Sequence, residues 1–301
     1  MDTNLRTISA LILSLLVVTG CSDVGRLSNS DQQDSTNLTA FNIDTSSEGR
    51  LLSAFYGLDD AIPFIASYRI CGEFGHTDGM PVMFSKELDL STMQAGDFLV
   101  TLADGQALNV GCATPAPAEG AGELRTMLLV GDFGSINNQP VTVKITGHIL
   151  SADQKTNFNG ASVDVTPLEA GPFLVLAEPV PESAWELGKE ATGLRFGGGD
   201  GCPVGTTQII RAVWAGGVTK PGGDEVDDLE RSSYSVFVEG DEGLLEVTPF
   251  AIGDLGDGDN NHELCLDTDS RAIRVEFPEN LMTDPREDLN PATSITVSYE
   301  S

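Results

Sequence analysis

The chain has 301 residues, of which 46 are acidic and 16 basic, so its formal net charge is −30. This balance excludes nucleic acid as an expected partner, because such binding depends on cationic side chains that displace phosphate counterions. With 40% hydrophobic residues, the chain can bury enough apolar surface for two domains of ordinary size.

The first segment in chain order is an apolar run from Ile8 to Val18. It is shorter than the roughly 20 residues that a membrane-spanning helix needs. The run ends in the sequence VTGC at Val18 to Cys21, which resembles the lipobox of bacterial lipoproteins. The resemblance implies a signal peptide over 1–20 and a lipidated Cys21 that ties the protein to a membrane. Ser22, in place of an aspartate, implies the outer membrane.

Residues 21–50 follow as a stretch of Ser, Asn, Asp, Gln and Thr with scattered single apolar residues. Such a composition cannot bury enough surface to offset the entropy lost on ordering. We therefore expect a flexible tether between the lipidated cysteine and the folded part.

The remainder of the chain contains a weak internal repeat, in which pairs of residues recur at the same spacing. The matching pairs are Cys71 and Val82 with Cys202 and Val213, then Val143 and Val165 with Val275 and Val297. The repeat predicts two copies of one module, at 51–170 and 171–301.

Short β-branched segments with alternating polarity fill both copies. Examples are Met80 to Phe84, Val141 to Ile145, Gln208 to Ala215 and Tyr234 to Val238. Period-two patterning between turn residues predicts an all-β fold with antiparallel sheets packed as a sandwich. A short helix is predicted only at Glu182 to Lys189, with a single turn at Ser91 to Gln94.

One stretch of the first copy carries a resemblance to a known family. Pro81 to Asp89, then Ser91 to Met93 and Gly96 to Val100, looks like the opening of the bacterial Ig-like domains found in surface-layer and adhesin proteins. The resemblance implies two tandem Ig-like antiparallel β-sandwich domains. It implies little about function, because such sandwiches host many unrelated tasks.

Besides Cys21, the chain has an even number of cysteines: Cys71, Cys112, Cys202 and Cys265. Disulfides persist in exported proteins, and the absence of a Cys-x-x-Cys pair argues against a thiolate metal site. We expect two disulfides, each within one copy, that join Cys71 to Cys112 and Cys202 to Cys265.

The main candidate site is the acidic loop at 254–263, which offers hard oxygen ligands on a glycine-bearing loop, as calcium requires. Its ligand side chains are Asp254, Asp257, Asp259, Asn261 and Glu263. The loop meets the first three positions of an EF-hand but has His262 and Thr268 where that motif needs glycine and glutamate. A calcium loop of another kind is therefore predicted, with ordinary turn chemistry as the alternative. The repeat aligns this loop with the bland segment Ala113 to Gly122, so folding alone does not require the carboxylates.

A second acidic cluster could supply ligands to the same cation or another. It comprises Asp224, Glu225, Asp227 and Asp228. Its simpler interpretation is a solvated loop, because carboxylates close in sequence repel one another.

Other motifs have plainer interpretations. Gly193 to Gly201 lacks the Lys-Ser/Thr of a phosphate loop and is interpreted as a flexible connection. His76 has acidic neighbours but no recognisable nucleophile nearby, so we interpret it as a loop histidine. Trp214 is expected in a core, and Trp185 is expected to contact a ligand or to pack at the domain join.

The leading functional hypothesis is a non-enzymatic envelope lipoprotein for binding, adhesion or structure, stabilised by calcium and facing the periplasm or the cell surface. Its expected partners are the membrane, through the lipid, and a glycan or protein ligand. The alternative is a hydrolase with a divalent metal held by the acidic loops of the second domain. An enzyme predicts a concave pocket with convergent carboxylates, whereas a subunit of a larger envelope machine predicts an uncovered apolar patch or sheet edge.

Overall fold

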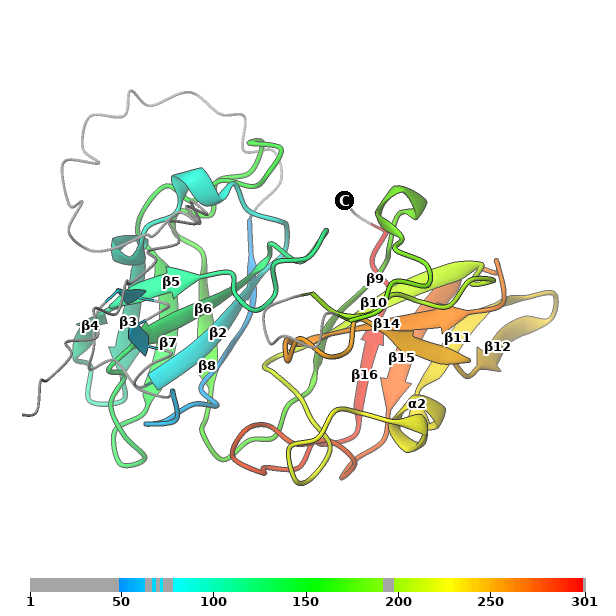
Figure 1. The fold of residues 1–301 in the computed structure, drawn as a ribbon. Coiled ribbons are helices and arrows are strands. Elements are labelled where there is room, and N and C mark those ends of the chain that lie inside the picture. Colours follow the sequence, from blue (N-terminus) through cyan, green and yellow to red (C-terminus); the bar gives the residue numbers. More distant parts are fainter. Residues whose placement is uncertain (1–48, 63–66, 69–70, 73–77, 192–197, 300–301) are drawn as a thin grey trace, which may run out of the picture.

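The computed structural model describes residues 49–62, 67–68, 71–72, 78–191 and 198–299. These residues form strands β1 to β16 with only short helical turns between them (Figure 1). The chain is therefore all-β, as the alternating pattern predicts.

The first eight strands form one sheet with the order β4-β3-β7-β8-β1-β2-β6-β5. Their bounds are β1 Leu51–Phe55, β2 Asp78–Phe84, β3 Phe98–Leu102, β4 Ala107–Asn109, β5 Cys112–Thr114, β6 Thr126–Gly131, β7 Pro140–Ile145 and β8 Ser162–Thr166. All pairs are antiparallel except β1 with β8, which is parallel. The expectation of purely antiparallel sheets is wrong at this pair, because the first and last strands of the half are far enough apart in sequence for a parallel connection.

The next eight strands form two sheets, with the orders β13-β14-β10-β9 and β12-β11-β15-β16. Their bounds are β9 Leu174–Pro179, β10 Gln208–Trp214, β11 Ser235–Gly240, β12 Gly243–Val247, β13 Ala251–Gly253, β14 Asn261–Leu266, β15 Ala272–Phe277 and β16 Thr293–Thr296. A parallel bridge between Ala177 and Val297 places β9 beside β16. When the two sheets are joined at this bridge, their order is β12-β11-β15-β16-β9-β10-β14-β13. This order matches that of the first half strand by strand.

The described helical elements are short: η3 Leu90–Thr92, η4 Ala95–Asp97, η5 Glu182–Ala184 and α2 Asp228–Ser233. The turn expected near Ser91 is present, but the helix expected at Glu182 to Lys189 ends after η5. It ends because Trp185 is extended and its indole N–H donates to the Val180 carbonyl over 2.8 Å. Within the described ranges, every helix is too short or too polar to serve as a membrane span.

Each half has its own apolar core. The first core contains Phe84, Phe98 and Phe158 with aliphatic residues from both ends of the strand order. The second surrounds Trp214, which is fully buried as the sequence predicts. Alternation along β7, where Val143 and Ile145 are buried and Lys144 between them is exposed, shows how the period-two pattern produces these cores.

The two halves meet at a junction between β2, β9 and β10. A small apolar cluster fills its centre: Leu52, Met83, Val175, Leu176 and Val213. Beside it, Arg125 of the first half pairs with Glu178 of the second at 3.0 Å. The junction brings the β5–β6 loop, residues 115–125, next to the β13–β14 loop, residues 254–260.

Both disulfides expected from the sequence are present. Cys71 is bonded to Cys112 with a Cα–Cα distance of 5.4 Å, and Cys202 is bonded to Cys265 with a distance of 5.7 Å. The first bridge ties the segment before β2 to β5, two strands away in the sheet, and the second ties the segment before β10 to the adjacent strand β14. Two such bonds are typical of proteins in oxidising, extracytoplasmic compartments.

Candidate functional site

The β13–β14 loop is held by hydrogen bonds among its own acidic residues. Asp259 accepts from the backbone N–H of Asn261 at 2.7 Å and from the Asn261 side-chain amide at 2.6 Å. Asp257 accepts from the backbone N–H of Asp259 at 3.3 Å. Asp254 adopts a left-handed conformation with φ of 66°, which is uncommon outside glycine. These features fold the loop back over the end of the sheet.

The β5–β6 loop of the first half delivers one buried carboxylate, Glu123, which is 4% exposed. The backbone N–H of Gly120 donates to its Oε2 at 2.5 Å. A Cβ at Gly122, where φ is 86°, would lie 2.2 Å from Nη1 of Arg211. Glycine at 122 is therefore required for the close approach of this loop to the second half.

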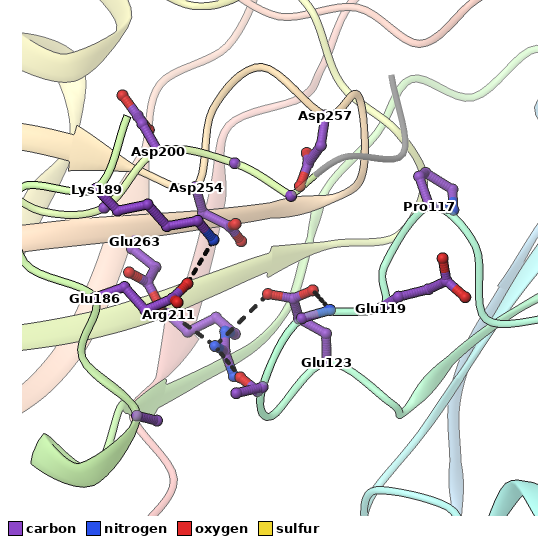
Figure 2. A pocket seen from close by; sticks show the side chains of 16 residues that line it. Pro117, Glu119, Glu123, Glu186, Lys189, Asp200, Arg211, Asp254, Asp257 and Glu263 are labelled. Atoms are coloured by element: carbon purple, nitrogen blue, oxygen red, sulfur yellow. Dashed lines mark hydrogen bonds and ion pairs between the residues drawn. The ribbon is translucent and has the colours of Figure 1, made fainter. Parts of the chain in front are cut away.

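Glu123 meets two residues of the acidic loop at the junction. One carboxylate oxygen from each of Glu123, Asp254 and Asp259 lies within 4.8 Å of the others. Oδ2 of Asp254 is buried and has no hydrogen-bond partner. Figure 2 shows the Asp254 and Glu123 carboxylates on either side of the space above Arg211. Such a spacing of oxygen atoms suits a single hard cation.

Arg211 on β10 provides the nearest positive charge. Its guanidinium lies 3.3 Å from Glu263, 3.7 Å from Glu123 and 3.9 Å from Glu178, and it donates to the carbonyl of Ala121 at 2.7 Å. Arg211 is 3% exposed. One buried guanidinium thus links both halves and neutralises part of the acidic charge.

The remaining charge is not neutralised by protein cations. The carboxyl groups gathered here are Glu123, Glu178, Asp254, Asp257, Asp259 and Glu263, against the guanidinium groups of Arg125 and Arg211. Lys189 lies beside them, but its ammonium pairs with Glu186 at 2.5 Å. Burial of unpaired carboxylates is costly, so such a group either takes up protons or binds a cation.

The pKa values show the same imbalance. Burial, reinforced by the charges of Asp259 and Glu123, raises the pKa of Asp254 to about 11. Burial also raises the pKa of Asp259 well above its ordinary value. Burial raises the pKa of Glu123, against the opposing influence of Arg211. In the absence of a metal the site therefore holds protons, and a bound cation would replace them.

A half-open pocket of about 290 Å³ leads to these carboxylates. Its walls come from both halves, with Pro117 and Gly120 on one side and Lys189, Gly199 and Asp257 on the other. Glu119 also lies on this wall, but its carboxylate points away from Glu123 (Figure 2). The pocket gives small hydrated cations a path to the buried oxygens.

The five predicted ligands have different positions. Asp254 and Asp259 join the cluster, and Asp257 lines the pocket. Asn261 holds Asp259 in place through its amide, and Glu263 faces Arg211. The carboxylate cluster thus draws two residues from the predicted loop, while Asn261 and Glu263 bind Asp259 and Arg211.

Glu123 is the residue that sequence reasoning missed. The repeat alignment set Ala113 to Gly122 against the acidic loop and stopped one residue short of it. The available signal was a glutamate that follows Gly120 and Gly122 and precedes the buried strand β6.

The second acidic cluster has structural partners of its own. Asp227 caps α2 by accepting from the Leu229 N–H at 3.0 Å and pairs with Lys220 at 2.7 Å. Asp228 pairs with Arg231 at 2.6 Å. All four of its acidic residues are exposed, and among the described residues only the junction cluster has metal-ligand spacing.

A buried polar network lies behind the acidic loop. The Trp214 indole N–H donates to the Tyr234 hydroxyl at 2.9 Å, and that hydroxyl lies 2.8 Å from Nδ1 of His262. Burial lowers the pKa of His262 to about 4. A neutral imidazole with its proton on Nε2 would accept from the Tyr234 hydroxyl, which itself accepts from Trp214.

The other sequence candidates contribute less. Trp185 is half-buried and packs on the Cys202–Cys265 bridge in its own half. Gly193 to Gly201 is described only from Gly198, where Gly199 packs against Asp254 and Asp200 accepts from the Leu255 N–H. Cys21 and His76 lie outside the described residues.

These features define an all-β protein with two disulfides and a buried carboxylate cluster between two strand repeats. No protein-family model matches the chain, and no curated protein is detectably similar to it. Among solved structures, the chain is similar to the N-terminal part of the bacterial S-layer protein SbsC, with a TM-score of 0.27 and 10% identity over 84% of this chain. The chain spans 45% of that protein's chain.

Proposed function

We propose that this protein is a non-enzymatic envelope module for binding, adhesion or structure, whose folded part is stabilised by a divalent cation. The cation would be held by Glu123, Asp254 and Asp259. One observation carries this proposal: oxygen atoms of these three side chains converge within 4.8 Å, and Oδ2 of Asp254 is buried without a hydrogen-bond partner.

Calcium is the cation that this set of ligands fits best. All three ligands are carboxylates, and hard oxygen donors with few neutral or sulfur ligands favour calcium or magnesium over zinc or copper. The loop at 254–260 turns at Gly256 and Gly258, both with positive φ, and the irregular ligand geometry of such a loop suits calcium better than the strict octahedral shell of magnesium.

The folded part would consist of two tandem Ig-like sandwiches, at 51–170 and 171–301. The strand order supports this, since β5-β6-β2-β1 and β4-β3-β7-β8 correspond to the D-E-B-A and C′-C-F-G orders of Ig-like folds. The same order recurs in the second half. The disulfides are not at the B–F position of antibody domains, so the relation would be one of architecture.

The anchor would be the lipid on Cys21, with residues 21–50 as a tether to the outer membrane. This part of the proposal depends on the lipobox-like sequence alone. Metabolic labelling with a radioactive fatty acid tests it directly, because the Cys21→Ala protein should lose both label and membrane association. A Cys21→Ala protein that stays in the membrane fraction would contradict it.

Isothermal titration calorimetry on the mature protein tests the cation site. Calcium chloride should give saturable binding in the unaltered protein and in Asp224→Asn, a control that removes a carboxylate from the exposed cluster. Asp254→Asn should lose the binding. The absence of binding in the unaltered protein, or equal binding by Asp254→Asn, would contradict the site.

A hydrolase with a divalent metal is the second candidate, because the carboxylates converge on a half-open pocket. That arrangement is the one expected of an enzyme. Assays with polysaccharide and phosphoester substrates in the presence of calcium, magnesium or manganese decide between the two. Turnover that disappears in Asp254→Asn would favour the hydrolase, and a glycan and matrix-protein binding screen would identify the ligand of a binding module.

A further inference from the structure

We propose that the cation is a bridge between the two halves, so that its binding couples their relative positions. This inference rests on the proposed cation site and adds a consequence to it. The ligand set is divided: Glu123 belongs to the first half, whereas Asp254 and Asp259 belong to the second. Neither half offers the three-carboxylate group by itself.

The two loops that meet at this site are equivalent in the repeat. Residues 115–125 connect β5 to β6, and residues 254–260 connect β13 to β14, the strands at the same places in the second strand order. The same connection of each half is therefore turned toward the other. The acidic residues of the second loop and Glu123 of the first loop lie where the two loops meet. Their position therefore suits a cation that joins the two halves.

The first loop is shaped for this contact. Gly120 binds the Glu123 carboxylate through its N–H, and Gly122 lets Arg211 of the second half lie against the loop. Arg211 in turn binds the Ala121 carbonyl. The backbone of one half thus fixes Glu123 at the point where the other half presents its carboxylates.

The other contacts across the junction are both apolar and polar. They include the small apolar cluster around Met83 and Val213, the Arg125–Glu178 pair, and a 3.5 Å contact between the Asn260 amide and the Thr126 hydroxyl. A divalent cation at the cluster would add a link across this junction, because carboxylates from both halves would then bind one positive centre.

Hydrogen exchange with mass spectrometry, paired with calorimetry on the same samples, tests the bridge. Calcium should slow amide exchange in both loops of the mature protein, residues 118–125 and residues 254–261. Glu123→Gln should weaken calcium binding by about tenfold or more, since one of three charged ligands is lost. It should also abolish the calcium-dependent protection of residues 118–125.

Glu119→Gln is the matched control, because it removes the same charge from the same loop where the carboxylate points away from the cluster (Figure 2). It should behave like the unaltered protein. Small-angle scattering gives a second measurement: the maximum dimension should shrink on calcium addition in the unaltered and Glu119→Gln proteins, but not in Glu123→Gln.

The outcomes separate the bridge from the site itself. Calcium binding with protection confined to residues 254–261 and no change in scattering would overturn the bridge and leave the cation site standing. Equal calcium affinity in Glu123→Gln and Glu119→Gln would also overturn the bridge. No calcium binding in the unaltered protein would overturn the cation site, and the bridge with it.

Discussion

The two halves share one strand order but bury different chemistry. The first half surrounds Phe84, Phe98 and Phe158, whose rings meet edge to face, in an apolar core. The second places Trp214 against Tyr234 and His262, joined by buried hydrogen bonds. The same strand order is therefore compatible with an apolar core and with a core that contains polar side chains. The core with polar side chains lies next to the loop that carries the candidate site.

The equivalent loops of the two halves differ in the number of carboxylates that they bring to the junction. The β5–β6 loop contributes one buried carboxylate, Glu123, while the β13–β14 loop contributes Asp254, Asp257 and Asp259. The second half thus carries most of the carboxylates at the junction, and the first supplies Glu123. This asymmetry can be tested by substitutions in either half.

The largest effect is expected for Arg211→Met. The change removes the guanidinium that faces Glu123, Glu178 and Glu263 and leaves buried carboxylates without a partner. The free energy of unfolding in chelator should fall by about 3–5 kcal/mol. Urea unfolding measures it, with Arg271→Met, at an exposed ion pair, as the control; equal losses in the two variants would contradict the role given to Arg211.

The next prediction concerns the dependence of stability on pH, and it involves a residue of the second half. The folded pKa of His262 is lowered to about 4 from an ordinary value near 6.5, so the unfolded state binds more protons between these values. Stability from this group is fully present above about pH 6.5 and is lost as the pH falls toward 4, by on the order of 3 kcal/mol.

The slope of unfolding free energy against pH in calcium-free buffer measures this contribution. Asp254, whose pKa is raised to about 11, makes a contribution of opposite sign to this slope. The proton that it binds stabilises the folded state and is lost as the pH rises. His262→Gln should therefore remove the positive contribution to the slope between pH 4 and 6.5 and make the measured slope more negative. His148→Gln, at an exposed position in the first half, should not, and a retained slope in His262→Gln would refute the assignment.

A tyrosine in each half provides a finer comparison. The Tyr234 hydroxyl bonds to Trp214 and His262 at 2.9 and 2.8 Å, whereas the Tyr56 hydroxyl makes longer bonds to Asp59 and Asp78 at 3.2 and 3.4 Å. Tyr234→Phe should cost about 1–3 kcal/mol, because buried partners are left unsatisfied. Thermal unfolding should show a smaller loss for Tyr56→Phe, and the reverse order would count against the network.

The smallest effect separates the two acidic clusters. Asp227→Ala removes the cap of α2 and should cost about 1 kcal/mol, the same with calcium as with chelator. Thermal unfolding in both conditions measures it. A calcium-dependent difference between Asp227→Ala and the unaltered protein would assign a cation to the exposed cluster instead.

Much of the fold follows from local patterns. The sequence pattern predicted β2, β7, β10 and β11 within a few residues. In β7 and β11 one face is more exposed than the other, whereas β2 and β10 are continuous apolar runs that are buried on both faces. The cysteine spacing placed both disulfides. The parallel pairing of β1 with β8 could not be predicted in this way, since it depends on which distant edges meet.

The same distinction applies to the site. Asp254 and Asp259 could be predicted because acidic and glycine residues concentrate within one short loop. Glu123 could not, because its role arises from a junction between segments more than a hundred residues apart in sequence. Helix α2 was missed for a related reason: its capping box, Asp227 with Glu230, lies within a cluster whose charge alone suggested a solvated loop.

The most direct test is the melting temperature of the mature protein in calcium and in chelator, measured beside Glu123→Gln. At about 100 times the dissociation constant, binding to the folded state alone contributes roughly 2.7 kcal/mol, so calcium should raise the melting temperature by several degrees. Glu123→Gln should lose most of that rise. Equal melting temperatures in calcium and chelator for the unaltered protein would contradict a cation site between the two halves.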